Sequence, residues 1–258
     1  MSNLEFYDAF ASTYADYYKG SSPKETVGTW CEILRSLGAW PTASAPRLLD
    51  LGCGPGAHLA PWAERGFRVE GLDGSPRMLA LARRVSCADQ LKVTTLYCAD
   101  VRDGMSLAPL RERYDLIVAH FNFLNLFPHG ELAKVLSGVA ALLKPEGLFV
   151  TDVTFWAPAE EVIPKDKSTS GADATSYLGE HGEIGITVNG RRVERHWRHL
   201  GADLVETLCA YSMEEIASAA AAGGLAIGKV APYYDNRDSD LSALPSSMVS
   251  RLIVMKPK

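Results

Sequence analysis

The sequence predicts an α/β protein built on a doubly wound, seven-stranded and mostly parallel sheet, with an N-terminal helical cap and an inserted antiparallel sheet. Three observations carry this prediction. Apolar segments of strand length alternate with helical segments between residues 47 and 155, which is typical of a parallel sheet covered on both faces. The first of these strands ends in a glycine-rich turn. Alternating segments joined by a two-residue turn follow residue 182, which indicates a separate antiparallel sheet.

The core elements follow from hydrophobic periodicity and from signals at the ends of each element. Ser75 is a plausible N-cap, and Ser212 with Glu215 forms a capping box at the start of a later helix. We expect strands at 47–51, 67–72, 91–97, 114–120 and 148–155, closing strands at 225–230 and 248–255, and helices at 59–65, 76–84, 131–143 and 213–222.

Two regions lie outside this core. Residues 4–36 show aromatic side chains near helical spacing, interrupted at 20–23, and predict helices. Residues 156–176 lack periodicity and predict a mobile loop. After them we expect strands at 183–188, 191–199 and 204–211, with Asn189-Gly190 as the turn. The length suits one domain with a cap in 1–40, a core in 46–155 and 212–258, and a lid in 156–211.

Composition narrows the class of protein. The chain has 258 residues, 47% of them hydrophobic, and a net charge of −5, which argues against nucleic acid as the main partner. No stretch resembles a signal peptide or reaches membrane-spanning length. Five scattered cysteines without a C-x-x-C pair indicate reduced thiols in a cytoplasmic protein. His196 and His199 lie three apart on a predicted strand and point to opposite faces, so we expect no metal. A homodimer is possible.

The turn after the first strand is the strongest functional signal. Gly52, Gly54 and Ala57 satisfy the dinucleotide fingerprint G-x-G-x-x-G/A, so a nucleotide-type cofactor is the first hypothesis. Pro55 removes one N–H donor from this turn, and Asp50 would place a carboxylate close to a pyrophosphate. An acid at this position suits a ligand with an ammonium or sulfonium charge better.

The run from Asp50 to Gly56, Asp-x-Gly-x-Gly-x-Gly, resembles motif I of class I S-adenosylmethionine (SAM) dependent methyltransferases of the small-molecule type. Asp73 ends the second strand 23 residues after Asp50, where a carboxylate can accept both ribose hydroxyls or simply cap a turn. The resemblance implies that Asp100 binds the adenine amino group. It implies SAM as cofactor, contacted by Tyr14, Asp50, Gly52, Cys53, Gly54, Gly56, Asp73, Gly74, Met78, Asp100, Val101, His120 and Phe121.

Two further segments carry the resemblance. The segment Phe6-Tyr7-Asp8-x-Phe10-Ala11-x-x-Tyr14 resembles the N-terminal cap of these enzymes, in which a tyrosine matching Tyr14 approaches the methionine end of the cofactor; packing on the core is the alternative. Residues 115–127 look like motif IV, beside cofactor and substrate, but Asn122 stands where an acid is frequent and Leu126 where many relatives place a histidine. His120 is the candidate catalytic group together with Tyr14, or it only lines the cofactor site.

Substrate choice is expected in the inserted sheet. Alternation sends Val193, Arg195, Trp197 and His199 to one face, which should turn toward the protein, and Arg192, Glu194, His196 and Arg198 to the face turned toward water. Arg195 is then either paired with Glu206 on the next strand or, with Trp197, a clamp for an acidic or aromatic substrate, with Tyr211 closing the pocket. We therefore name Asn122, Arg195, Trp197 and Tyr211 as candidate substrate-binding residues.

The resemblance implies transfer of a methyl group from SAM to an amine or hydroxyl of a small molecule, a metabolite or natural product. An amine must be neutral to attack, whereas a hydroxyl usually needs a base. Two alternatives are an NAD(P)-dependent reductase, which Asp50, Pro55 and Asp100 disfavour, and a SAM-binding protein of this fold that does not transfer methyl.

Overall fold

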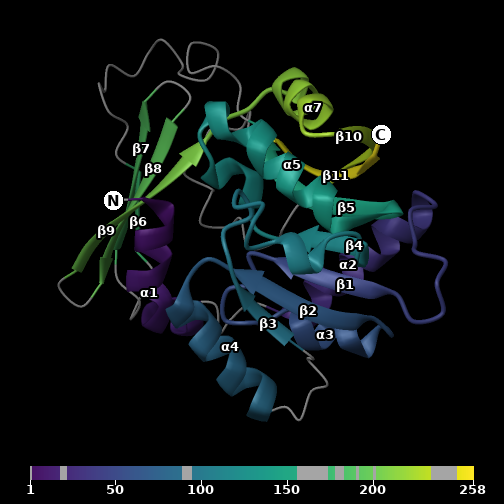
Figure 1. The fold of residues 1–258 in the computed structure, drawn as a ribbon. Helices are drawn as coiled ribbons and strands as arrows, with labels where there is room; N and C mark the ends of the chain where they lie inside the picture. Colours follow the sequence, from purple (N-terminus) through teal and green to yellow (C-terminus); the bar gives the residue numbers. More distant parts are fainter. Residues whose placement is uncertain are drawn as a thin grey trace.

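A computed structural model of the chain confirms the predicted architecture; it describes residues 2–17, 22–88, 95–155, 174–177, 183–189, 192–199, 202–233 and 249–258. A seven-stranded sheet has the order β10-β11-β5-β4-β1-β2-β3 (Figure 1). Strands β1 to β5 pair in parallel, and β11 pairs antiparallel with both β5 and β10. Because β1 lies between β2 and β4, the chain reverses its winding direction beside β1, where ligands bind in open α/β sheets.

The elements lie close to their predicted ranges. The large sheet contains β1 (Arg47–Leu51), β2 (Arg68–Asp73), β3 (Thr95–Cys98), β4 (Tyr114–Ala119), β5 (Leu143–Phe155), β10 (Leu225–Pro232) and β11 (Val249–Pro257). The helices of this layer are α2 (Pro23–Ser36), α3 (Leu59–Glu64), α4 (Pro76–Ala88), α5 (Leu132–Leu142) and α7 (Met213–Ala222). The predicted cap at Ser75 and capping box at Ser212 are both present. The main difference is β5, which starts at Leu143 because its first residue pairs with Tyr114 of β4.

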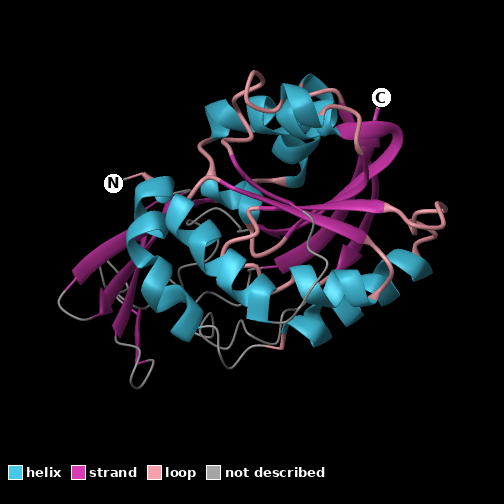
Figure 2. Cartoon of the chain, turned by 60° about the horizontal axis from the view of Figure 1, so that its bottom comes forward, coloured by secondary structure: helices cyan, strands magenta, loops and turns pink. Residues whose placement is uncertain are grey.

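Side-chain alternation along the central strands builds a core on each face of the sheet. Leu49, Leu51 and Ile117 pack with α5 and α7 on one face, whereas Leu48 and Val118 pack with α2 and α3 on the other. Figure 2 shows helices on both sides of the sheet. Since parallel strands are buried on both faces, their sequences read as apolar runs and not as alternating patterns.

The inserted segment forms a second, four-stranded antiparallel sheet. Its strands are β6 (Ala174–Tyr177), β7 (Glu183–Asn189), β8 (Arg192–His199) and β9 (Ala202–Cys209), in that order. The expectation of a loop through residue 176 was wrong at its end, because residues 174–177 pair with β7. Four residues are too few for periodicity to reveal a strand, and pairing decides their conformation. The rest of that expected loop, Gly190 of the predicted Asn189-Gly190 turn and residues 91–94 lie outside the described residues.

The two N-terminal helices have different environments, although we predicted a single cap. Val27, Trp30 and Leu34 of α2 are buried in the core beneath the large sheet. Helix α1 (Asn3–Tyr17) instead packs Phe6 and Phe10 against Trp197 of β8, beside the second sheet (Figure 1). Of the two N-terminal helices, α1 is therefore the one that contacts the second sheet.

Two further findings concern the described part of the chain. No helix there has the length and apolar character needed to cross a bilayer. Cys31, Cys53, Cys98 and Cys209 are free thiols.

Candidate functional site

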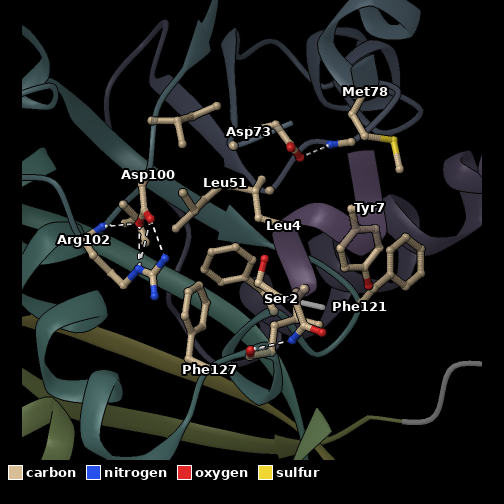
Figure 3. A pocket seen from close by; sticks show the side chains of 18 of the residues that line it. Ser2, Leu4, Tyr7, Leu51, Asp73, Met78, Asp100, Arg102, Phe121 and Phe127 are labelled. Atoms are coloured by element: carbon tan, nitrogen blue, oxygen red, sulfur yellow. Dashed lines mark hydrogen bonds and ion pairs between the residues drawn. The ribbon is translucent and has the colours of Figure 1, made fainter. Parts of the chain in front are cut away.

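A cavity of about 440 Å³ lies at the carboxyl ends of β1, β2, β3 and β4 (Figure 3). Helix α1 and the strands β8 and β9 contribute the remaining walls. The position agrees with the rule for open α/β sheets, since it includes the point where the strand order reverses. Ten predicted site residues line this cavity: Tyr14, Gly52, Gly54, Asp73, Gly74, Met78, Asp100, Val101, His120 and Phe121.

The glycine turn exposes backbone on the cavity wall. Gly52 and Gly54 have φ angles of +71° and +52°, which side chains rarely tolerate. A Cβ atom at Gly52 would lie 2.8 Å from the ring of Phe123. The turn is held by backbone N–H groups of Gly52 and Cys53, which donate to the carbonyl of Leu72, and by Gly54 N–H, which donates to Asp73 Oδ2 at 2.8 Å.

Asp50 and Asp73, two acids next to the turn, both have raised pKa values. Asp50 is 1% exposed, and its Oδ2 has no hydrogen-bond partner among the described residues. Burial, and then the nearby Asp73 carboxylate, raise the pKa of Asp50 to about 8. Burial also raises the pKa of Asp73, against two backbone N–H donors from Gly54 and Ser75 that oppose the rise. Burial makes the ionised form of Asp50 unfavourable. A cation bound nearby would offset this cost by its attraction to the carboxylate.

Asp100 is fixed by an arginine two residues later. Its carboxylate accepts from the backbone N–H of Arg102 at 2.8 Å and from Arg102 Nε at 2.9 Å, and these contacts lower the pKa of Asp100. Arg102 also pairs with Glu131 and lies over the ring of Phe127, 5.5 Å from its centroid. The adenine-binding carboxylate implied by the resemblance is thus ionised and held rigidly at the cavity wall (Figure 3).

Helix α1 carries Tyr7 and Tyr14 on the cavity wall, with ring centroids 6.0 Å apart. Asp8 fastens this helix to α4: its Oδ1 accepts from Ser75 Oγ at 2.7 Å and from Arg77 N–H at 3.1 Å. Asn3 at the start of α1 fastens the helix to the second sheet, because its side chain bonds both the N–H and the carbonyl of Thr207 in β9. Helix α1 is therefore attached both to α4 and to β9 at the cavity wall.

His120 follows β4 and lies in an aromatic stack. Its ring is stacked on His58, with centroids 4.3 Å apart, and lies 4.0 Å from the ring of Trp30. The indole N–H of Trp62 donates to His120 Nε2 at 3.1 Å. A proton on Nε2 would oppose that donor, so the arrangement favours a neutral ring with its proton on Nδ1. The geometry favours the alternative in which His120 lines the cavity and is not a base.

Asn122 is absent from the cavity wall. Its Oδ1 accepts from Thr154 Oγ1 at 2.7 Å, and its backbone N–H donates to Asp152 Oδ2 at 3.0 Å. Phe121 and Asn122 both have left-handed φ angles, +63° and +58°, so the chain turns sharply after β4. This turn puts Phe121 on the wall and directs Asn122 into a polar network against β5.

The predicted lid residues Arg195, Trp197 and Tyr211 do not form the substrate clamp that we considered. Arg195 pairs with Glu206 at 2.7 Å, the alternative given above, and Trp197 packs on Phe10 with ring centroids 4.8 Å apart. Tyr211 is buried and donates its hydroxyl proton to the carbonyl of Phe127. The cavity wall includes none of these three side chains. Arg192, which alternation sends to water, lies on the wall, and its side chain is 59% exposed.

Three predicted cofactor residues, Asp50, Cys53 and Gly56, are absent from the cavity wall and contribute structure near it. The side chain of Cys53 belongs to the core beneath the sheet, and burial raises the pKa of its thiol. Gly56 (φ +83°) allows close packing, because a Cβ atom there would lie 3.1 Å from Ala82 and from Leu59. The wall also includes residues that we did not predict as site residues, several of them inside the segments that carry the resemblance: Ser2, Asn3, Leu4, Tyr7, Leu51, Leu72, Ala99, Arg102, Phe123, Leu126, Phe127, Pro128, Glu131, Arg192, Thr207 and Cys209.

A metal centre is not indicated in the part of the chain described, where no three His, Cys, Asp or Glu side chains gather in a way that could hold an ion.

The sequence is similar to methyltransferases. A family profile described as a methyltransferase domain matches residues 48–147. A putative methyltransferase YqeM of Bacillus subtilis is 29% identical over 67% of this chain and 65% of its own length, so the chain spans just under two thirds of that relative. A dTDP-3-amino-3,6-dideoxy-alpha-D-glucopyranose N,N-dimethyltransferase of Streptomyces fradiae is 30% identical over 62% of this chain and 59% of its length.

A solved structure supports the same assignment. The SAM-bound structure of CalS10, an amino pentose methyltransferase from Micromonospora echinaspora, has a TM-score of 0.63, 26% identity, and covers 95% of both chains. These likenesses favour SAM as cofactor over the nicotinamide cofactor of a reductase.

Proposed function

We propose that the chain is a class I SAM-dependent methyltransferase that transfers a methyl group from SAM to an amine or hydroxyl of a small molecule. The observation that carries the proposal is the cavity at the strand ends, with an exposed glycine turn on one side and the cap and lid on the other. In this proposal the glycine turn holds the cofactor, and the cap and lid admit the substrate.

The residues of the turn fit SAM by charge and by space. Gly52 and Gly54 present backbone at the wall without side chains, and the carboxylate of Asp50, buried behind the turn, would favour a positively charged ligand by its charge. Asp73 would hold the ribose hydroxyls and Asp100 the adenine amino group. SAM when bound supplies a methyl group already activated by the sulfonium charge.

The task left to the protein is alignment and exclusion of water. Holding two reactants at near-attack geometry contributes on the order of 7–11 kcal/mol in ideal cases. Tyr7, Tyr14, Phe121 and His120 line the space between cap and strand ends, and Asn3 and Asp8 fasten the N-terminal half of α1. Because Nε2 of His120 already accepts a hydrogen bond from Trp62, it is a poor acceptor for a substrate proton, which favours an amine nucleophile that is neutral at the working pH.

A small-molecule substrate agrees with the cavity and with the acidic chain. Its volume of about 440 Å³ suits a small ligand, and a net charge of −5 argues against nucleic acid as the main partner. The named substrates of two relatives are amino sugars, so amino sugars are the first class to test. We also propose that the enzyme acts in the cytoplasm, as its reduced thiols favour.

Incubation with methyl-labelled SAM and a panel of amino sugars, small amines and phenols tests the proposal. We expect labelled product with at least one member, and mass spectrometry should show the gain of one or two methyl groups. Gly52→Val is the matched inactive variant, because its side chain would strike Phe123. Binding of NADH in calorimetry, together with no binding of SAM, would refute the assignment.

A further inference from the structure

Three side chains connect the inserted sheet to the cavity through a buried carboxylate. Arg195 of β8 places Nε 2.7 Å from Oε2 of Glu206 on β9, and the hydroxyl of Tyr7 donates to Oε1 of the same carboxylate. Arg195 and Glu206 are register partners on adjacent strands. Tyr7 comes from α1 and lines the cavity (Figure 3), whereas Arg195 and Glu206 stand behind it.

The contacts among Arg195, Glu206 and Tyr7 fix the orientation of each side chain. Glu206 is 2% exposed and the Arg195 side chain 20%, so the carboxylate depends on its two partners for stabilisation. A buried charge whose partner is removed is strongly destabilising, which makes the geometry of this group well determined. The two oxygens of Glu206 serve different partners, so Tyr7 has one acceptor and one orientation.

The proton of Tyr7 is therefore directed away from the cavity toward Glu206. Burial raises the pKa of Tyr7 well above its ordinary value, and the Glu206 carboxylate raises it further. The phenol stays protonated and cannot act as a base near neutral pH. Since the hydroxyl proton is committed, the remaining lone pairs of the oxygen are the polar feature that Tyr7 can offer to a ligand.

We propose that the Arg195–Glu206 pair positions Tyr7 so that its hydroxyl oxygen accepts a hydrogen bond from the N–H or O–H of the group to be methylated. This inference rests on the proposed function and adds a substrate requirement: the nucleophile must carry a hydrogen that it can donate. Tyr7 is the residue that contacts substrate, and Glu206 and Arg195 are positioning residues that act through it. Arg195 thus has a role other than the substrate clamp.

The positioning is tested without any substrate, by NMR of protein labelled at the tyrosine Cζ carbons. Tyr7→Phe identifies the Tyr7 resonance by its loss. In the wild type this resonance should stay unshifted up to pH 10.5, where exposed tyrosines titrate. Glu206→Gln should shift it at neutral pH and lower its pKa, because the carboxylate that accepts the proton is removed. Glu194→Gln is the matched control, since Glu194 lies on the same sheet but pairs with Arg192.

The accepting role is tested with methyl-labelled SAM and a protein-free metabolite extract as probe. Loss of one hydrogen bond should lower kcat roughly three- to tenfold in Tyr7→Phe, with unchanged SAM affinity. Glu206→Gln and Arg195→Met should lower kcat by similar factors, and Tyr7→Phe combined with Glu206→Gln should be no slower than Tyr7→Phe alone. Losses that multiply, or a Tyr7→Phe variant with wild-type kcat, would overturn the proposal.

The two tests separate the possible failures. A Tyr7 resonance that is identical in the wild type and in Glu206→Gln would overturn the positioning by Glu206, whatever the activity. No labelled product with the wild-type enzyme would refute the proposed function and the accepting role with it, while the resonance still decides whether Glu206 positions Tyr7.

Discussion

Asp50→Asn should weaken SAM binding and stabilise the free protein, both in a pH-dependent way. The pKa of Asp50 is raised to about 8 because the carboxyl is buried and faces Asp73. Below pH 8 the free protein carries this group mostly protonated. A ligand with an ammonium or sulfonium charge binds better to the ionised form, so binding at pH 7 should release a proton.

The magnitude follows from the position of the pKa. Affinity for SAM should rise by up to tenfold per pH unit below 8 and level off above it, which amounts to roughly 100-fold between pH 6 and pH 8. Isothermal titration calorimetry over this range, in buffers of different ionisation enthalpy, measures both the affinity and the released proton. In Asp50→Asn the slope should disappear, and affinity at pH 8.5 should be lower than in the wild type.

Stability should change in the opposite direction. The folded pKa of Asp50 lies above the unfolded value of about 3.9, so between these values the folded state binds more protons and stability falls as pH rises. The cost at pH 8 is on the order of 5 kcal/mol as an upper bound. Asp50→Asn should remove it and raise the midpoint of urea unfolding at pH 8, with little effect at pH 4.

Asp103→Asn is the control, since Asp103 is an exposed acid on the loop after β3. It should change neither the slope of SAM affinity nor the unfolding midpoint. The reasoning would be refuted if the wild-type affinity for SAM were independent of pH between 6 and 8, or if Asp50→Asn destabilised the free protein at pH 8.

Three further predictions concern the walls of the cavity. Asp73→Ala should weaken SAM binding ten- to a hundredfold, because charge-assisted hydrogen bonds are worth about 1.5–3 kcal/mol; unchanged affinity in calorimetry would exclude Asp73 as the ribose ligand. Tyr14→Phe should raise the KM for SAM and leave the free energy of unfolding within about 0.5 kcal/mol of the wild type. A KM equal to that of the wild type would show that Tyr14 has no role at the cofactor. His120→Phe should lower kcat but preserve the shape of its pH profile, since Trp62 occupies Nε2; loss of a limb of that profile would identify His120 as a titrating base.

The sequence alone determined the large sheet and the side of it that binds the cofactor. A parallel strand is buried on both faces and is therefore apolar along its whole length, as in Arg47–Leu51. Such a run can be recognised within one short segment of the sequence. The acids that end them, Asp73 and Asp100, reach one edge because parallel strands end together. Gly52 and Gly54 marked the cofactor turn in the sequence, because a backbone with a positive φ angle favours glycine.

Only the tertiary structure decided which side chains behind that edge face the cavity. Periodicity assigned Arg195 and Trp197 correctly to the face of β8 that turns inward, but that face meets α1, and the cavity lies at the end of the other face. We predicted Trp197 and not Tyr7 as a pocket residue, yet Tyr7 lies on the cavity wall and Trp197 fills the space between helix and sheet. Such choices depend on contacts between residues about 200 positions apart, such as Tyr7 with Glu206. A pattern within one segment carries no information about the partner that will cover it.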